Sequence, residues 1–348
     1  MLGLNHIEIV GRYKNSTVHA YTLTGGLIYS SKNQVFSIED LDNPIPRLIC
    51  TIPWDWKAIP SHVRIFDRYL KYSILQVAPV YGEKYLVCNG HHWWCIEANG
   101  KVIPIKPFAK TRPMNRGICV ATSNNVYVAE YTSNQKRLPI HIFRTCDMYT
   151  FEVAWEFPEK EVRHVHAIIE DPEASNRLWV FTGDNDNESN FYVTEDNFVT
   201  LEKVCGGEQK YRTTDMIFYN GDLIWGMDSP LVTSFIMKGK RDRLLDAQEL
   251  FELPGPAYYT CQNQAGGLYM ATTVEPGPAV KDDQSHLIGL RPNGKWEDML
   301  QLKTDWFPNF GILYFPRGVL PENYLVFSQR ALNPWEGYMT IARDKAWV

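Results

Sequence analysis

The sequence predicts an all-β protein, a single β-propeller of seven four-stranded blades that spans residues 1–348. The first observation is a repeat: the polar residues Arg68, Arg116, His164 and Arg212 each open an apolar run and follow one another at intervals of 48 residues. The second is the scarcity of helical periodicity. Repeats of about 40–50 residues with four strands each are typical of propellers, and seven of them nearly fill the 348 residues.

The second strand of each repeat is its clearest element. It begins with a glycine, asparagine or acidic turn residue and continues as a β-branched or aromatic run. Residues 238–250 fit either a helix or a charged outer strand, and six blades remain an alternative if the first repeat is assigned differently. The predicted second strands lie within residues 25–31, 83–90, 124–131, 176–184, 221–228, 266–273 and 322–329.

The two ends of the chain predict how the propeller closes. The last repeat supplies strands near 311–316, 322–328 and 337–342. Residues 7–10, Ile-Glu-Ile-Val, form a strand with no partner before it. We therefore expect this strand to be the outermost strand of the last blade, which removes an exposed sheet edge.

Composition limits the function classes. A net charge of −5 and the absence of a basic run argue against a nucleic-acid partner. No apolar stretch reaches the roughly 18 residues of a membrane span, so no membrane partner is expected. The N-terminus lacks the features of a signal peptide, which predicts a cytoplasmic location. The seven cysteines are an odd number without a CxxC pair and are predicted to be buried free thiols.

A further marker occurs in two middle repeats. Residues 145–151, TCDMYTF, and 194–201, TEDNFVTL, resemble degenerate Asp-boxes, whose pattern is S-x-D-x-G-x-T-W. The chain thus resembles the BNR (sialidase-like) repeat superfamily over most of its length. The glycine of the box is missing from both copies. The aspartate of such a box is expected to hold the turn between the third and fourth strands, so the motif is structural.

Candidate functional residues share one phase of the repeat. In a propeller, the innermost strand starts on the face where the second strand ends, so the residues at these positions are expected to meet at one mouth of the channel. His166 lies two residues along its strand from His164, on the same side. The opening residues are Arg68, Arg116, His164, Arg212 and Tyr258, and the closing ones include Glu130, Tyr131, Asp184, Asp186 and Asp228.

The three arginines predict recognition of a carboxylate, because the guanidinium fork binds it in bidentate fashion. The resemblance points the same way, since sialidases hold their substrate carboxylate with three arginines. The alternative is a structural ring, in which each arginine pairs with an acidic neighbour such as Glu130, Asp184 or Asp228.

The two histidines have three interpretations. They act as acid or base, they form structural hydrogen bonds, or they bind a divalent metal together with Asp184 or Asp186. Nearby guanidinium groups would repel a cation. We therefore expect no cofactor, and a metal at His164, His166 and Asp184 is the alternative.

These observations predict a carbohydrate-active enzyme that cleaves a glycosidic bond in an acidic glycan of the uronic- or sialic-acid type. A lyase would use arginine to neutralise a uronate carboxylate and His164, His166 or tyrosine to remove the α-proton. A sialidase-like hydrolase would use Tyr258, paired with Glu130, or a carboxylate as nucleophile, and an aspartate such as Asp184 as acid. The alternative from another class is a non-catalytic propeller that binds a glycan or a protein.

Overall fold

Seven sheets dominate the structure, and they confirm the predicted seven-bladed β-propeller. The computed structural model describes residues 6–54, 56–109, 112–307 and 310–347. The chain divides into two compact units. The first comprises Met1–Lys106, Cys261–Thr273 and Asp283–Val348, and the second comprises Pro107–Thr260 and Val274–Asp282.

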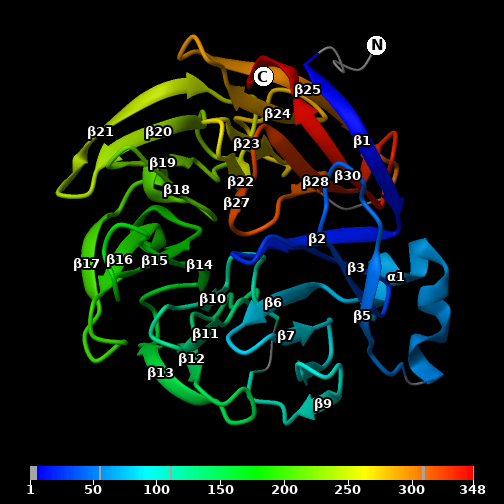
Figure 1. Cartoon of the computed structure of the whole chain (residues 1–348). Helices are drawn as coiled ribbons and strands as arrows, with labels where there is room; N and C mark the ends of the chain where they lie inside the picture. The colour runs from blue at the N-terminus through cyan, green and yellow to red at the C-terminus, as the bar shows by residue number, and fades with distance from the viewer. Residues whose placement is uncertain (1–5, 55, 110–111, 308–309, 348) are drawn as a thin grey trace. The chain divides into compact units, whose positions relative to one another are not determined.

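The second unit holds three sheets whose strands follow one another in sequence order (Figure 1). The first sheet consists of β10 (Ile118–Val120), β11 (Val126–Ala129), β12 (Ile140–Thr145) and β13 (Glu152–Phe157). The next consists of β14 (His164–Glu170), β15 (Leu178–Gly183), β16 (Asn190–Thr194) and β17 (Glu202–Gly206). The third consists of β18 (Ile217–Tyr219), β19 (Asp222–Gly226), β20 (Phe235–Lys240) and β21 (Arg243–Glu252).

The first unit holds the other four sheets, apart from the first residues of β22 (Ala257–Asn263). One of them consists of β2 (Ser16–Tyr21), β3 (Leu27–Ser31), β4 (Gln34–Ile38) and β5 (Arg47–Thr51). Another consists of β6 (Gln76–Val80), β7 (Lys84–Cys88), β8 (Trp93–Ile96) and β9 (Val102–Ile105). A third contains β22 (Ala257–Asn263), β23 (Leu268–Thr272), β24 (Gln284–Leu290) and β25 (Trp296–Thr304), with the short strands β27 (Val319–Leu320) and β29 (Leu332–Asn333) at its edges.

The seven predicted second strands are all confirmed, as β3, β7, β11, β15, β19, β23 and β28 (Tyr324–Arg330). Residues 238–250, for which the sequence left helix and strand open, belong to β20 and β21. In the ladder between these strands, Lys238 pairs with Gln248 and Lys240 pairs with Arg243, which is the register of an antiparallel hairpin.

The predicted closure is also confirmed. The last sheet has the order β1–β30–β28–β26, so β1 (Ile7–Lys14) is an edge strand paired antiparallel with β30 (Tyr338–Asp344), and β26 (Ile312–Tyr314) is the opposite edge. Figure 1 shows the blue N-terminal strand beside the red C-terminal one.

Deleting residues 1–12 should therefore lower the melting temperature sharply, because the backbone groups of β30 lose the ladder that β1 provides. Thermal unfolding followed by circular dichroism measures the change. A truncated protein that melts at the temperature of the full chain would show that β1 contributes little to the closed blade.

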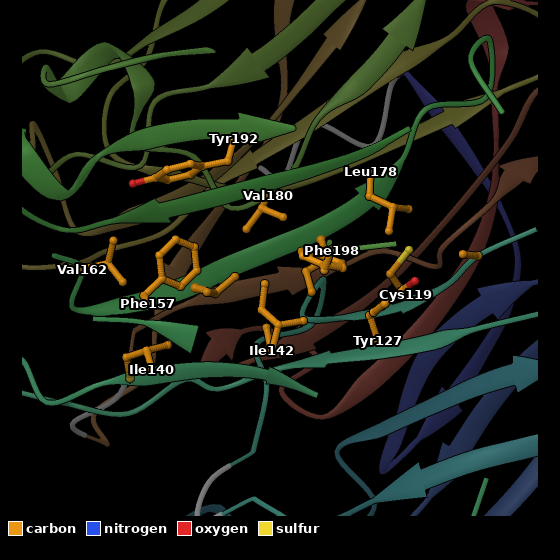
Figure 2. Close-up of a cluster of buried hydrophobic side chains, with 14 residues drawn as sticks. Cys119, Tyr127, Ile140, Ile142, Phe157, Val162, Leu178, Val180, Tyr192 and Phe198 are labelled. Atoms are coloured by element: carbon orange, nitrogen blue, oxygen red, sulfur yellow. The ribbon is translucent and has the colours of Figure 1, made fainter. Parts of the chain in front are cut away.

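Apolar side chains fill the space between neighbouring sheets of the second unit. Figure 2 shows Ile140 and Ile142 of β12 on one side and Val180 of β15 on the other, with Phe157 between them. All four are at most 3% exposed. A sheet in a propeller is covered on both faces, which explains why β15 is a nearly continuous apolar run.

Both aspartates of the Asp-box-like segments hold turns, as the sequence predicts. The Asp147 carboxylate accepts hydrogen bonds from the backbone and hydroxyl of Thr150, at 2.8 and 2.6 Å. Asp196 accepts the same pair from Thr200, at 2.9 and 2.7 Å. The first turn joins β12 to β13 and the second joins β16 to β17. These aspartates are therefore architectural.

The predicted state of the cysteines is confirmed: all seven are free, and all but Cys146 are buried. Among the residues that the structure describes, no helix has the length and apolar character needed to cross a bilayer.

One predicted element is wrong. The segment opened by Arg68 was expected to be an inner strand, but Arg64–Leu70 is the helix α1, preceded by the 3-10 helix η1 (Trp56–His62). The innermost strand of this blade is β6, which starts at Gln76. The 48-residue step from Arg68 to Arg116 is therefore a coincidence of spacing, since Arg68 belongs to an excursion between two blades.

Candidate functional site

Two histidines and one aspartate converge in the second unit. The Nε2 atoms of His164 and His166 are 3.1 Å apart, and each lies 3.3 Å from Oδ1 of Asp184. The two rings are almost fully buried, while the Asp184 side chain is 17% exposed. The three atoms thus form a nearly equilateral triangle whose aspartate corner reaches solvent.

A bulge in β14 helps to aim the histidines. In the ladder between β14 and β15, Val165 pairs with Thr182 and Ala167 with Phe181, so His166 is the extra residue. Bulges redirect side chains and are frequent beside functional sites. The bulge brings the His166 ring close to Gly183, where a Cβ atom would lie 2.9 Å from Nε2. Only glycine leaves room for the ring at this position.

The hydrogen bonds on the far side of each ring fix the tautomers. Nδ1 of His164 lies 2.7 Å from the backbone oxygen of Thr132, and Nδ1 of His166 lies 3.0 Å from that of Thr213. A carbonyl oxygen only accepts, so each Nδ1 carries a proton, and a ring without a second proton turns the lone pair of Nε2 toward the triangle. Three electron-pair donors face one another, an arrangement that a cation between them stabilises.

The donor set fits a divalent transition metal. Imidazole nitrogen and carboxylate oxygen bind such ions at about 2.0–2.2 Å, and a tetrahedral ion at that distance holds its ligand atoms about 3.3–3.6 Å apart. The observed separations of 3.1 and 3.3 Å are close to this value. Backbone carbonyls behind the ligating histidines are the usual orienting groups of metal sites. The alternative to a metal ion between these three atoms is a proton bound to Nε2 of one of the two rings.

Arg163 holds the other oxygen of the aspartate. Its guanidinium is ion-paired with Oδ2 of Asp184, and its Nε donates to the backbone oxygen of Ser133 at 2.8 Å. Burial by itself raises the pKa of Asp184, but in the metal-free protein a hydrogen bond donated by His164 or His166, when that ring carries a proton on Nε2, outweighs burial and holds the pKa well below its usual value. The carboxylate is therefore fixed, charged and turned toward the histidines.

A second group of charges borders the triangle. Nη2 of Arg212 lies 3.4 Å from Oδ1 of Asp184 and 3.6 Å from Glu275, and its Nε lies 3.5 Å from Asp228. These are long contacts, and Nε of Arg212 has no hydrogen-bond partner. Burial raises the pKa of Asp228 and of Glu275, although Arg212 opposes the shift in both.

Two tyrosines complete the surroundings. The Tyr131 ring lies against His164, with centroids 4.2 Å apart. The Tyr258 hydroxyl donates to Glu275 across 3.4 Å. Burial, followed by the charge of nearby carboxylates, raises the pKa of both tyrosines, so both are neutral phenols at neutral pH.

The prediction that three arginines converge is not supported. Arg116 is buried, and its guanidinium donates to Asp215 at 2.8 Å, to Asn115 at 3.0 Å and to the backbone oxygen of Thr260 at 2.9 Å. Arg68, in the first unit, is engaged by Asp305. These two arginines follow the structural alternative, in which arginine pairs with acidic residues of the protein itself, whereas Arg212 borders the triangle.

Two predicted acidic residues also have other partners. Glu130 accepts hydrogen bonds from the backbone and ring of His141, at 2.9 and 2.7 Å, so the expected pairing with Tyr258 is wrong and Glu275 takes that place. Asp186 is exposed and accepts from Gln209 at 2.8 Å, outside the triangle. Of the two aspartates predicted as alternative metal ligands, Asp184 is the one that lies next to the histidines.

The sequence reasoning missed Arg163 and Glu275. Arg163 directly precedes the first histidine, so its position next to the site was a usable signal. Glu275 lies in the segment Val274–Asp282, which follows β23 in sequence but belongs to the second unit. No repeat position marks it, and only the folded chain brings it to Arg212.

Comparisons with known proteins establish the fold alone. No family model and no curated protein matches the chain. A catalytically inactive virginiamycin B lyase from Staphylococcus aureus, solved with quinupristin, superposes with a TM-score of 0.60 at 10% identity, covering 97% of this chain and 98% of that one. A streptogramin B lyase gives 0.59 at 10% identity over 96% and 93%. An extracellular domain of a putative one-component system from B. thetaiotaomicron gives 0.57 at 8% identity over 97% and 39%.

Proposed function

We propose that the chain is an enzyme that cleaves a glycosidic bond in an acidic glycan with the help of a divalent metal ion held by His164, His166 and Asp184. The observation that carries the proposal is the triangle of two imidazole lone pairs and one carboxylate oxygen, 3.1–3.3 Å apart. When bound, the metal supplies a Lewis acid for an oxygen of the substrate.

The charges around the triangle support an anionic substrate. Arg163 and Arg212 contribute two positive charges, and Asp184, Asp228 and Glu275 contribute at most three negative ones. A divalent ion makes the sum positive, +1 when every carboxyl is ionised and higher when Asp228 or Glu275 is protonated. A carboxylate, as in a uronic acid, satisfies this excess charge. The tyrosine rings offer flat surfaces against which a sugar can pack.

The residues present favour elimination over sialidase-like hydrolysis. The three-arginine clamp is absent among the described residues of the second unit, because Arg116 is bound to Asp215. The Tyr258–Glu275 contact instead provides a pair that can move one proton. Glu275 accepts the proton from the carbon next to the carboxylate, and the bond from the neighbouring carbon to the glycosidic oxygen breaks as the double bond forms.

Tyr258 completes the proton balance. Its neutral hydroxyl gives a proton to the leaving oxygen, and the proton on Glu275 returns to the phenolate across the 3.4 Å contact. Arg212 binds the substrate carboxylate, whose charge would otherwise oppose removal of the neighbouring proton. Membership of the BNR superfamily is compatible with this proposal and remains a prediction.

The test is an elimination assay on chelator-treated protein, before and after Mn²⁺ or Zn²⁺ is added, with uronate polymers as substrates. We expect metal-dependent growth of the ultraviolet absorbance of an unsaturated product. Glu275→Gln and Tyr258→Phe should each lower kcat by about 10²–10⁴-fold, the usual contribution of a positioned acid or base. Metal affinity should stay unchanged in both variants, since neither side chain is a ligand.

His141→Gln is the matched control, because His141 is a hydrogen-bonded histidine of the same unit outside the triangle. It should retain full activity. If the assay releases reducing sugar but no unsaturated product, the reaction is hydrolysis and not elimination. Glycan binding without any turnover would favour the non-catalytic propeller, and full turnover by the metal-free protein would overturn the role of the metal.

A further inference from the structure

The excursion between β5 and β6 contains a helix with its charges turned inward. In α1, Asp67 and Arg68 are buried, whereas Phe66 and Tyr69 are 53% and 78% exposed. Val63, one turn earlier, is 53% exposed. Residues 63, 66 and 69 lie on one side of a helix, so the apolar stripe of α1 faces solvent. A surface helix ordinarily has the opposite orientation.

Specific contacts hold the inverted helix in place. The Arg68 guanidinium is ion-paired with Asp305 and lies over the Phe307 ring, 4.4 Å from its centroid. Arg64 binds both carboxylate oxygens of Glu336, at 3.0 and 3.1 Å. Removal of Arg68 would leave Asp305 without its cation, and removal of Arg64 would leave Glu336 with only the longer contact to Arg68, at 3.8 Å. These ion pairs with residues of the first unit therefore stabilise the orientation of α1.

The exposed stripe belongs to a larger apolar face, which we call the α1 face. Trp306 adjoins Phe307, with ring centroids 5.9 Å apart, and so lies beside the contact between Arg68 and Phe307. Large exposed apolar patches on a soluble protein mark interaction sites. The members of the face, with their exposures, are Trp56 at 75%, Ile59 at 63%, Val63 at 53%, Phe66 at 53%, Tyr69 at 78% and Trp306 at 82%.

We propose that the α1 face is the interface of a homodimer, in which it packs against the same face of a second copy of this chain. The proposal is independent of the function assigned to the second unit. Its first support is area. Since a large aromatic side chain offers about 150–250 Å², the six side chains together expose on the order of 800 Å², which is what one partner contributes to a standard interface.

Composition and charge also fit a second copy. Tryptophan and tyrosine are the residues most enriched at the energetic centres of interfaces. The acidic groups that belong to this module and are described, Asp67, Asp305 and Glu336, are turned toward Arg64 and Arg68. Two copies of the face therefore meet without opposing carboxylates from these residues, and a two-fold axis through the stripe pairs apolar side chains with their own equivalents.

Sedimentation velocity of the full chain over a range of concentrations tests the proposal. The wild type should sediment as a dimer, and the double variant Phe66→Lys/Tyr69→Lys should sediment as a monomer, with the dimer dissociation constant raised at least about a hundredfold. Circular dichroism should show the same melting temperature for the variant monomer as for the diluted wild type, because both side chains point away from the core.

Leu23→Lys is the matched control: Leu23 is a fully exposed leucine of the same unit outside the α1 face, and the variant should remain a dimer. A wild type that stays monomeric at every concentration would overturn the proposal, as would a dimer that the double variant leaves intact. A monomer that sediments with lipid vesicles through Phe66 and Tyr69 would also overturn it, and would identify the face as a membrane-binding surface.

Discussion

Asp184→Asn should lower the affinity for a divalent metal ion on the order of a hundredfold or more. Asparagine keeps an oxygen near the two histidines but removes the negative charge that the ion requires. Tetrahedral protein sites bind zinc with about 10–16 kcal/mol, so one of four ligands accounts for roughly 3 kcal/mol, and 1.4 kcal/mol is a factor of about ten. Isothermal titration of chelator-treated protein with Zn²⁺ or Mn²⁺ measures the loss.

Asp186→Asn is the control for this experiment. Asp186 lies two residues further along the same loop, and its carboxylate accepts from Gln209 instead of facing the histidines. Its removal should leave metal affinity nearly unchanged. Equal effects of the two substitutions would mean that the ion is attracted by the general charge of the loop, and the triangle would then not be the binding site.

The stability of the folded protein provides a second readout of the same substitution. An ion that binds only the folded state raises the free energy of unfolding by about 2.7 kcal/mol when its concentration is a hundred times Kd. The melting temperature of the wild type should therefore rise when metal is added after chelation, and that of Asp184→Asn should not. If no divalent ion raises the melting temperature of the wild type, the triangle holds a shared proton and not a metal ion.

The blades were predictable because their signals are local. Each second strand is a short apolar run bounded by turn residues, and the spacing of these runs gives the number of blades. The N-terminal strand was recognised because it had no partner in its own neighbourhood. The excursion at residues 56–70 broke the pattern. Its apolar side chains face solvent, so alternation of polar and apolar residues could not distinguish a helix from a strand there.

The site was predictable only in part. The phase of the repeat correctly brought His164, His166 and Asp184 together, because all three lie at strand ends of a single blade. Residues from other blades were harder to assign, since a polar residue at the right phase can turn toward the protein itself. Glu130 turns to His141 and Arg116 turns to Asp215. Whether a charge is free for a ligand depends on long-range partners that the repeat does not encode.

Arg116→Ala should destabilise the fold by about 3–5 kcal/mol, the usual cost of breaking a buried ion pair. Both partners are less than 10% exposed. The Asp215 carboxylate, which accepts from Arg116 and from the backbone and hydroxyl of Thr260 on one oxygen, would keep its charge without a counterion. Denaturant unfolding of the chelator-treated protein measures the change.

Asp215→Asn in the Arg116→Ala background should recover part of that loss. The asparagine oxygen still accepts from Thr260 but carries no charge, so the double substitution removes the unpaired carboxylate. The sum of the two single effects should therefore exceed the effect of the double variant by at least about 1 kcal/mol. Additive effects would show that the ion pair contributes no coupling energy.

Arg212→Ala distinguishes the two kinds of arginine. Its contacts with acidic groups are 3.4–3.6 Å long, so its loss should cost less stability than the loss of Arg116. Binding of an acidic oligosaccharide to the folded, metal-loaded protein should instead weaken by roughly 1.5–3 kcal/mol, the value of a charged hydrogen bond. If Arg212→Ala destabilises the fold as much as Arg116→Ala and the folded fraction binds the ligand as before, both arginines are structural and the substrate carboxylate needs another partner.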